Sequence, residues 1–185
     1  MPSPNPIKRA VSLLLLSALL LAAGTWLWDT PMVRALAEMF RLSRMPAPLE
    51  LSVPVQGVPA KRVADTWGAS RSNGRTHQGV DIFSARGTPV LSATRGVLAR
   101  IGESGLGGRH AWVIGPGGER HYYAHLDGWA PGLRRWQVLR AGDPIGFVGT
   151  TGNARGTPPH LHYGIYTVNG AQNPQPRLRD ADPAR

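Results

Sequence analysis

The pattern of apolar and polar positions begins with one long apolar stretch near the N-terminus. Residues 10–28 contain no charged side chain and have Leu at eight positions. About nineteen helical residues span roughly 28 Å, close to the hydrocarbon thickness of a bilayer. Trp26 and Trp28 would then lie at the membrane interface. We therefore expect a short tail at residues 1–9 and a transmembrane anchor at residues 10–28. A cleaved signal peptide is the alternative, because small residues occupy positions 22–24.

A second, shorter helix and a Pro-rich segment are predicted next. Thr30 followed by Pro31 is typical of an N-cap and the first residue of a helix. The apolar residues that follow at helical spacing are Met32, Val33, Leu36, Met39 and Phe40. This amphipathic helix lies either on the membrane surface or against the following domain. Four Pro within residues 45–59 then indicate a stiff, extended linker or edge segment. Residues 29–60 are thus expected to be a helix and a linker.

The rest of the chain predicts a β-rich domain. Between about residues 63 and 176, short β-prone runs alternate with Gly, Pro, Asn or Asp. These runs are Pro89 to Ala93, Gly96 to Ile101, Ala111 to Ile114, His121 to Leu126, Pro144 to Val148 and His160 to Tyr166. No segment shows a sustained helical period, and no internal repeat is present. We expect a mainly β domain over residues 61–178 and a C-terminal tail at residues 179–185.

Composition limits the chemistry that the chain can support. The absence of Cys excludes disulfides and thiolate metal sites, so any metal must be held by His and carboxylate groups. The net charge of +10 comes mostly from Arg, which suits attraction to a polyanion or is simply a basic surface. The Arg residues are dispersed and form no basic stripe with interleaved aromatic residues, so nucleic-acid binding is not expected.

One candidate site lies in the last β-prone run. Alternate side chains share one face of a strand, so His160 and His162 would point into the same cleft. The side chains that would point to the opposite face are Leu161, Tyr163 and Ile165. The competing interpretation is a pair of exposed histidines on a polar face.

A second candidate site combines His77 with Asp81. In an extended chain these two residues lie about 13 Å apart, too far for both to reach one ion at about 2 Å. A bend at Gly79 would let His77 fold back over Asp81. The competing interpretation is that Asp81 caps a turn and His77 is a surface residue.

The remaining histidines are harder to rank. His121, Tyr123 and His125 would share one face of a strand, with the two histidines about 13 Å apart, so both cannot bind one ion. The sequence alone does not rank His125 above His121. His110 has no companion at motif spacing, and we expect His110 and His121 to be structural or solvent-facing. Together, the histidine signatures offer two imidazole ligands, one carboxylate and two spare imidazoles. Three protein ligands with one open position are typical of a catalytic zinc site.

Short motifs occur in a fixed order along the β-rich part. They are His77-x-x-x-Asp81, Gly87-Thr-Pro-Val90, Gly96-Val97, Tyr123-Ala-His-Leu126, Gly142-Asp143, Ile145-Gly-x-Val-Gly149 with Thr151-Gly152, and His160-Leu-His162-Tyr163. In this order, over about 110 residues, they resemble the motifs of the lysostaphin-type (LytM-like) zinc metallopeptidases, which cut peptide bonds in bacterial peptidoglycan. Two departures are modest: Pro158-Pro159 stands where Gly-Pro is commoner, and Tyr163 replaces the usual Phe.

The resemblance implies a fold, a cofactor and a set of site residues. The fold is a small, mostly antiparallel β-structure with the active site in a groove across the sheet. The implied ligands of Zn²⁺ are His77, Asp81 and His162, and the implied catalytic residues beside the metal are His125 and His160. Arg71 falls where the family often has a residue that steadies the substrate or the oxyanion.

The resemblance also implies a function. We expect a membrane-anchored zinc metalloendopeptidase that binds peptidoglycan peptide stems and hydrolyses their crosslinks. The single-pass anchor would lie in the inner membrane with the catalytic domain in the periplasm; secretion after signal cleavage is the alternative. One rival is a catalytically inactive LytM-like regulator of another wall hydrolase, and a second is a tethered β-domain that merely binds metal. The sequence leaves the oligomeric state open, and it does not choose between a D-Ala to diaminopimelate crosslink and a Gly-rich bridge.

Overall fold

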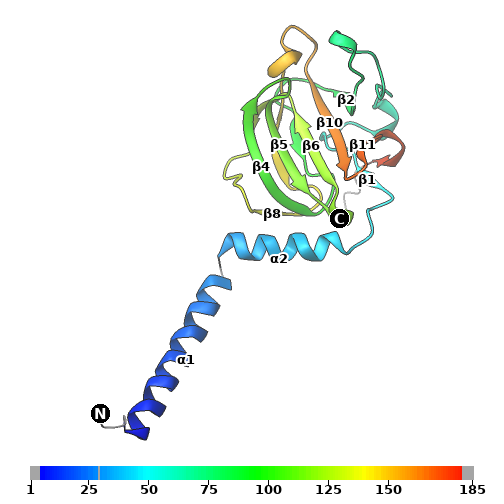
Figure 1. The fold of residues 1–185 in the computed structure, drawn as a ribbon. Helices are drawn as coiled ribbons and strands as arrows, with labels where there is room; N and C mark the ends of the chain where they lie inside the picture. The colour runs from blue at the N-terminus through cyan, green and yellow to red at the C-terminus, as the bar shows by residue number, and fades with distance from the viewer. Residues whose placement is uncertain (1–4, 29, 181–185) are drawn as a thin grey trace.

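Two helices lead into a curled β domain (Figure 1). The computed structural model describes residues 5–28 and 30–180; the outer parts of both predicted tails, 1–4 and 181–185, lie outside the described residues. The helices are α1 Pro6–Trp28 and α2 Pro31–Ser43. The strands are β1 Leu51–Ser52, β2 Val80–Phe83, β3 Pro89–Leu91, β4 Gly96–Ser104, β5 Gly108–Ile114, β6 Arg120–Ala124, β7 Leu126–Trp129, β8 Val138–Leu139, β9 Pro144–Val148, β10 His160–Thr167, β11 Gly170–Gln172 and β12 Leu178–Arg179.

The prediction of a mainly β, antiparallel domain is confirmed. Each of the predicted β-prone runs carries a strand, and β9 has the predicted limits. The run from His121 to Leu126 is split, because His125 has a positive φ of 63° and interrupts the strand between β6 and β7. The sequence did not mark β2, β8, β11 or β12, which are short and have no long β-prone run of their own.

Strand β10 pairs with three other strands. The main sheet has the order β11-β10-β6-β5-β4-β8, and β2 also pairs with β10. Strand β2 runs antiparallel to residues 160–163 of β10 on one edge, and β6 runs antiparallel to residues 162–166 on the other edge. Strand β11 pairs with residues 165–167. A smaller sheet has the order β3-β9-β7, and β1 pairs with β12 in parallel. The main sheet therefore brings residues from three separate chain segments together beside the start of β10.

The hydrophobic core lies on one face of β10. Leu161, Tyr163 and Ile165 are fully buried, as their alternation along the strand predicts. From β6, Tyr123 is also fully buried, and its hydroxyl accepts a hydrogen bond of 3.0 Å from the backbone N–H of Ala93. Because this face of β10 is filled by apolar side chains, the other face is left for the histidines.

The segment predicted as a linker belongs to the core. Leu51, Val53 and Val55 are each only 2% exposed and lie in the main hydrophobic cluster. Strand β1 pairs with β12 near the C-terminus, and Val55 forms a bridge with Val90. Of the two interpretations of residues 45–59, the edge segment is therefore the observed one. The packed unit starts upstream of residue 61, because an extended chain that buries its apolar side chains is not a free linker.

Helix α2 packs against the β domain. The Thr30 hydroxyl caps it by accepting a hydrogen bond of 3.4 Å from the N–H of Val33, as the sequence predicts. Ala35 and Leu42 are fully buried and cluster with Val97 of β4. A second row of apolar side chains on α2 stays exposed: Met32, Leu36 and Phe40. One face of α2 is thus covered by the domain, and a neighbouring apolar face is not.

Helix α1 is long and apolar enough to cross a membrane, and none of its residues is buried by the rest of the protein. It begins at Pro6, before the predicted start at residue 10, so the two basic residues Lys8 and Arg9 form part of its first turns. Length and composition alone do not distinguish an anchor from a signal sequence, since both carry such a helix.

The contribution of residues 51–55 to the core can be tested by truncating one side chain. We expect Leu51→Ala to lower the free energy of unfolding by about 2–5 kcal/mol, because it leaves a cavity in a packed core. Leu49 is 87% exposed and provides the matched control. Leu49→Ala should change stability by less than about 0.5 kcal/mol in urea denaturation. Equal effects of the two substitutions would contradict this placement of the segment.

Candidate metal centre

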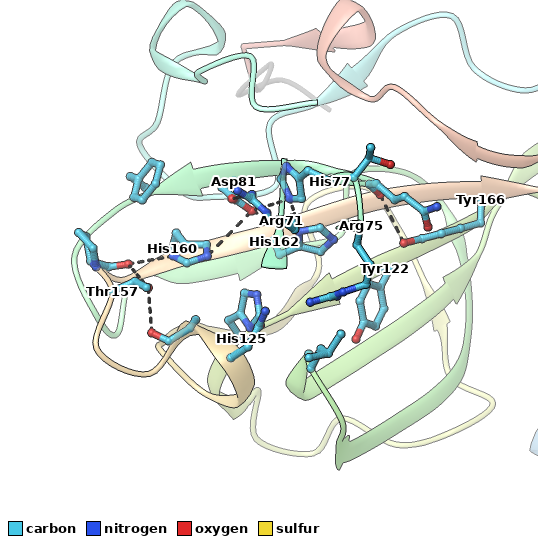
Figure 2. A pocket seen from close by; sticks show the side chains of 18 of the residues that line it. Arg71, Arg75, His77, Asp81, Tyr122, His125, Thr157, His160, His162 and Tyr166 are labelled. Atoms are coloured by element: carbon cyan, nitrogen blue, oxygen red, sulfur yellow. Dashed lines mark hydrogen bonds and ion pairs between the residues drawn. The ribbon is translucent and has the colours of Figure 1, made fainter. Parts of the chain in front are cut away.

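The register between β2 and β10 places an acidic side chain beside a histidine. Asp81 lies directly opposite His162 in the antiparallel pair. On β2, Val80 and Ile82 point into the core, so Asp81 points to the opposite face, which β10 shares with His160 and His162. The predicted alternation along β10 is thereby confirmed: both histidines point into one groove, where Figure 2 shows them together with Asp81.

A bend before β2 brings His77 to the same point. The chain bends at Gly79, as predicted, and His77 Nε2 lies 3.0 Å from Asp81 Oδ1. A Cβ atom at Gly79 would lie 2.6 Å from the carbonyl oxygen of Tyr163 and 2.7 Å from Cε1 of His162. Only glycine allows β10 to approach this closely. The bend thus brings the His77 and Asp81 side chains into contact, whereas an extended chain would separate these two residues by about 13 Å.

Three potential ligand atoms form a small triangle. His77 Nε2 lies 2.8 Å from His162 Nδ1, and His162 Nδ1 lies 3.2 Å from Asp81 Oδ1. Among the described residues, these three form the only cluster of His, Cys, Asp or Glu whose geometry could hold a metal ion. Ligand atoms at about 2.0–2.1 Å from a tetrahedral zinc lie about 3.3 Å apart. The triangle is therefore only a few tenths of an ångström tighter than zinc requires, and its donor set suits zinc.

Thr66 holds two of these residues in place, although no sequence pattern marks it as a site residue. Its carbonyl oxygen accepts a hydrogen bond of 2.6 Å from Nδ1 of His77, which leaves Nε2 free to act as a ligand. Its hydroxyl accepts a hydrogen bond of 2.9 Å from the backbone N–H of Asp81. Thr66 lies in no motif, so only the folded chain reveals this role.

The protonation states of Asp81 and His162 favour the binding of a metal ion. Burial alone would raise the pKa of Asp81, but hydrogen bonds and charge from His162 and His77 hold the pKa of this carboxyl well below its usual range. Burial lowers the pKa of His162. At neutral pH the triangle therefore offers a carboxylate and a neutral imidazole at His162, the forms in which these side chains bind a metal.

His125 and His160 lie beside the triangle. Nδ1 of His125 donates to the carbonyl oxygen of Thr151 at 2.9 Å, and Nδ1 of His160 donates to that of Pro158 at 2.8 Å. In the neutral form of each ring, Nε2 is therefore the acceptor, and His160 Nε2 lies 3.9 Å from Asp81 Oδ1. Desolvation and then the neighbouring histidines lower the pKa of His125 to about 4, so it is neutral at physiological pH. Both rings can accept a proton in the groove.

The prediction that His121 and His125 share one face is wrong. His125 leaves the strand with its positive φ and lines the groove, whereas His121 is fully buried on the core side. Nδ1 of His121 pairs with the hydroxyl of Tyr163 at 2.7 Å, and burial lowers the pKa of His121 to about 3. His110 is also buried and bonds to the Gly108 carbonyl oxygen. Both are structural, which was one of the two expected outcomes.

Arg71 lies at the candidate metal centre, where it contacts Asp81. Its Nη2 is 2.5 Å from Oδ2 of Asp81, the carboxylate oxygen that does not belong to the triangle. This contact orients Asp81 so that Oδ1 faces the two histidines. The guanidinium therefore positions a candidate ligand, and its predicted contact with substrate remains untested.

These residues line a groove of about 730 Å³ (Figure 2). The Phe83 ring and the Pro158 carbonyl contact the ring of His160. Thr157 lies on the same side, while Tyr122 and Tyr166 lie on the other side of His162. The size of the groove suits a peptide segment.

Comparison with known proteins supports a family assignment for the β domain. Residues 75–174 match Peptidase family M23. The chain is 40% identical over 125 residues to an L-Ala–D-Glu endopeptidase from Bacillus subtilis, a match that covers 62% of this chain and 38% of that protein. The chain thus spans well under half the length of this relative.

Solved structures agree as well. The catalytic domain of lysostaphin from Staphylococcus simulans has a TM-score of 0.56 and 31% identity, covering 63% of this chain and 92% of that one. A zinc-containing peptidase from Vibrio cholerae has a TM-score of 0.55 and 25% identity, covering 64% and 37%. The family match extends over more than half of the chain and includes the three groove-facing segments. The chain therefore belongs to peptidase family M23.

Proposed function

We propose that this protein is a zinc-dependent endopeptidase that hydrolyses peptide bonds in bacterial peptidoglycan. The observation that carries the proposal is the triangle of His77, Asp81 and His162, with two further imidazoles beside it in an open groove. Three ligands leave a fourth tetrahedral position for water, which distinguishes catalytic zinc sites from structural ones. The name of the B. subtilis relative, an L-Ala–D-Glu endopeptidase, supports a stem peptide as substrate.

Three of the five residues would bind the metal, and the other two would transfer protons. His77, Asp81 and His162 would hold Zn²⁺, which when bound lowers the pKa of water and polarises a carbonyl group. The free Nε2 atoms of His125 and His160 face the groove, where they can accept the proton of the attacking water and return one to the leaving amine. As a protonated imidazole, either ring can also donate to the developing oxyanion.

The completeness of the site favours an enzyme over an inactive regulator. An inactive member of the fold needs no intact set of ligands and proton carriers. Here the five predicted positions all carry the expected residue, and the backbone carbonyls of Thr66, Thr151 and Pro158 orient three of the imidazoles. Such support for ring orientation serves metal binding and proton transfer.

We further propose that α1 anchors the protein in the inner membrane, with the β domain in the periplasm. Support comes from the apolar length of α1 and from Trp26 and Trp28, which are exposed at its end. Two residues separate the end of α1 from the start of α2, which keeps Met32, Leu36 and Phe40 exposed. An apolar face so close to a membrane span suits an interfacial location. Secretion after signal cleavage is the alternative.

The assignment of ligands and catalytic histidines predicts two classes of variant. Asp81→Ala and His162→Ala should lose both zinc and activity, because each removes a ligand. His125→Ala should retain one zinc per chain and lose activity by about 10²–10⁴-fold, because it removes a proton carrier. Zinc content by mass spectrometry and cleavage of purified muropeptides measure the two effects. A His125→Ala variant that cleaves at the wild-type rate would contradict the catalytic role.

The close contact between Gly79 and the His162 ring predicts that a substitution at Gly79 lowers zinc affinity, even though it removes no ligand. Gly79→Ala should weaken zinc binding by about 10–100-fold, the size typical of changes that misorient a ligand, because its Cβ displaces the His162 ring. Gly128→Ala is the matched control, since a Cβ there meets no atom within 4 Å. Competition with a chromophoric chelator measures both affinities. Unchanged affinity in Gly79→Ala would show that His162 does not depend on this contact.

The anchor proposal predicts the fate of the N-terminus. In a Gram-negative host, the full chain should sediment with membranes, resist extraction at high salt and keep residues 5–28 in its intact mass. A soluble periplasmic product that starts after the small residues 22–24 would instead establish signal cleavage.

A further inference from the structure

A hairpin over residues 68–77 lines the groove beside the candidate metal centre. The N–H of Gly68 bonds to the His77 carbonyl at 2.9 Å, and the N–H of His77 bonds to the Ala69 carbonyl at 2.9 Å. Closer to the tip, the N–H of Arg71 bonds to the Arg75 carbonyl at 2.8 Å. The tip turns through two left-handed residues, at positions 73 and 74. The hairpin thus has a pinned backbone that ends in the candidate ligand His77.

The two arms of this hairpin carry two arginines with different surroundings. Arg71 turns inward and forms its ion pair with Asp81. Arg75 is exposed, and its guanidinium donates only to Ser72, at 3.3 Å to the carbonyl oxygen and 3.4 Å to the hydroxyl. Both Ser72 contacts are long and involve neutral groups. Within residues 5–28 and 30–180, no acidic side chain forms an ion pair with Arg75.

Arg75 points into the groove. It lines the cleft, and Figure 2 shows its side chain descending from the hairpin on the side of Tyr122. Burial raises the pKa of Tyr122 to about 12, so the phenol is neutral and adds no negative charge beside the guanidinium. Asp81 is the only carboxylate among the described groove residues, and it already contacts Arg71 and two histidines. The charge of Arg75 is therefore uncompensated by the groove.

We infer that Arg75 binds a free carboxylate of the substrate next to the scissile bond. The inference rests on the proposed peptidase function and names the substrate class of the same groove. A guanidinium presents a planar set of donors that matches a carboxylate, and hydrogen bonds between charged groups are the stronger ones. Stem peptides and their direct crosslinks carry such carboxylates on D-Glu and diaminopimelate residues, whereas a glycine bridge has none along its length. Arg75 thus selects acidic stem peptides and takes no part in the chemical step.

A pair of matched substrates tests this role. One is a stem peptide with the free carboxylate next to the cleaved bond, and the other carries a carboxamide at that position. The full chain in detergent, loaded with zinc, should cleave the acid with a kcat/KM about 10–100-fold higher than the amide, as expected for a charged hydrogen bond. Arg75→Gln should remove this preference by raising KM for the acid, with kcat and the amide rate little changed. Arg75→Lys should restore part of it.

Arg62 provides the control, because it is exposed and lies outside the groove. Arg62→Gln should keep the wild-type preference for the acid. Equal rates of the wild type on acid and amide, or an equal loss on both in Arg75→Gln, would overturn the inference while leaving the peptidase proposal intact. Preferred cleavage of a glycine bridge would overturn it too. If the wild type cleaves no peptidoglycan peptide, the proposed function itself fails.

Discussion

The antiparallel register of β2 on β10 is the constraint on which the rest of the site depends. It sets Asp81 opposite His162, and the bend at Gly79 then returns His77 to the same point. A shift of one residue in this pairing would turn Asp81 into the core and Val80 toward the groove. The register is held by the apolar residues of both strands, so the hydrophobic core and the metal centre are specified by the same pairing. This shared origin explains how a small β domain can hold three candidate ligands from two distant segments without disulfides.

Much of the site follows from the alternation of side chains along strands, and the rest depends on backbone turns that alternation does not encode. The orientation of His160 and His162 was predictable because Leu161 and Tyr163 must be buried. The separation of His125 from His121 was not, because it depends on one left-handed residue within a β-prone run. The role of Thr66 could not be predicted either. Its carbonyl oxygen and hydroxyl bind His77 and Asp81, which lie 11 and 15 residues away in the sequence.

The N-terminal region shows the same division between local and tertiary signals. The cap at Thr30 and the helix after it follow from local chemistry, and the structure confirms both. Whether α2 and the Pro-rich segment pack on the domain depends on which apolar surface is nearest, and this became clear only from the burial of Ala35, Leu42 and Leu51. These contacts join the end of α1 to the β domain by a short, packed connection.

The most direct test of the central claim is zinc-edge X-ray spectroscopy on the full chain loaded with one equivalent of Zn²⁺, together with anomalous diffraction from its crystals. One zinc should appear between His77 Nε2, Asp81 Oδ1 and His162 Nδ1, with protein ligands at about 2.0–2.1 Å and a solvent oxygen in the fourth position. A zinc ion bound elsewhere, or one that lacks any of these three ligands, would contradict the account.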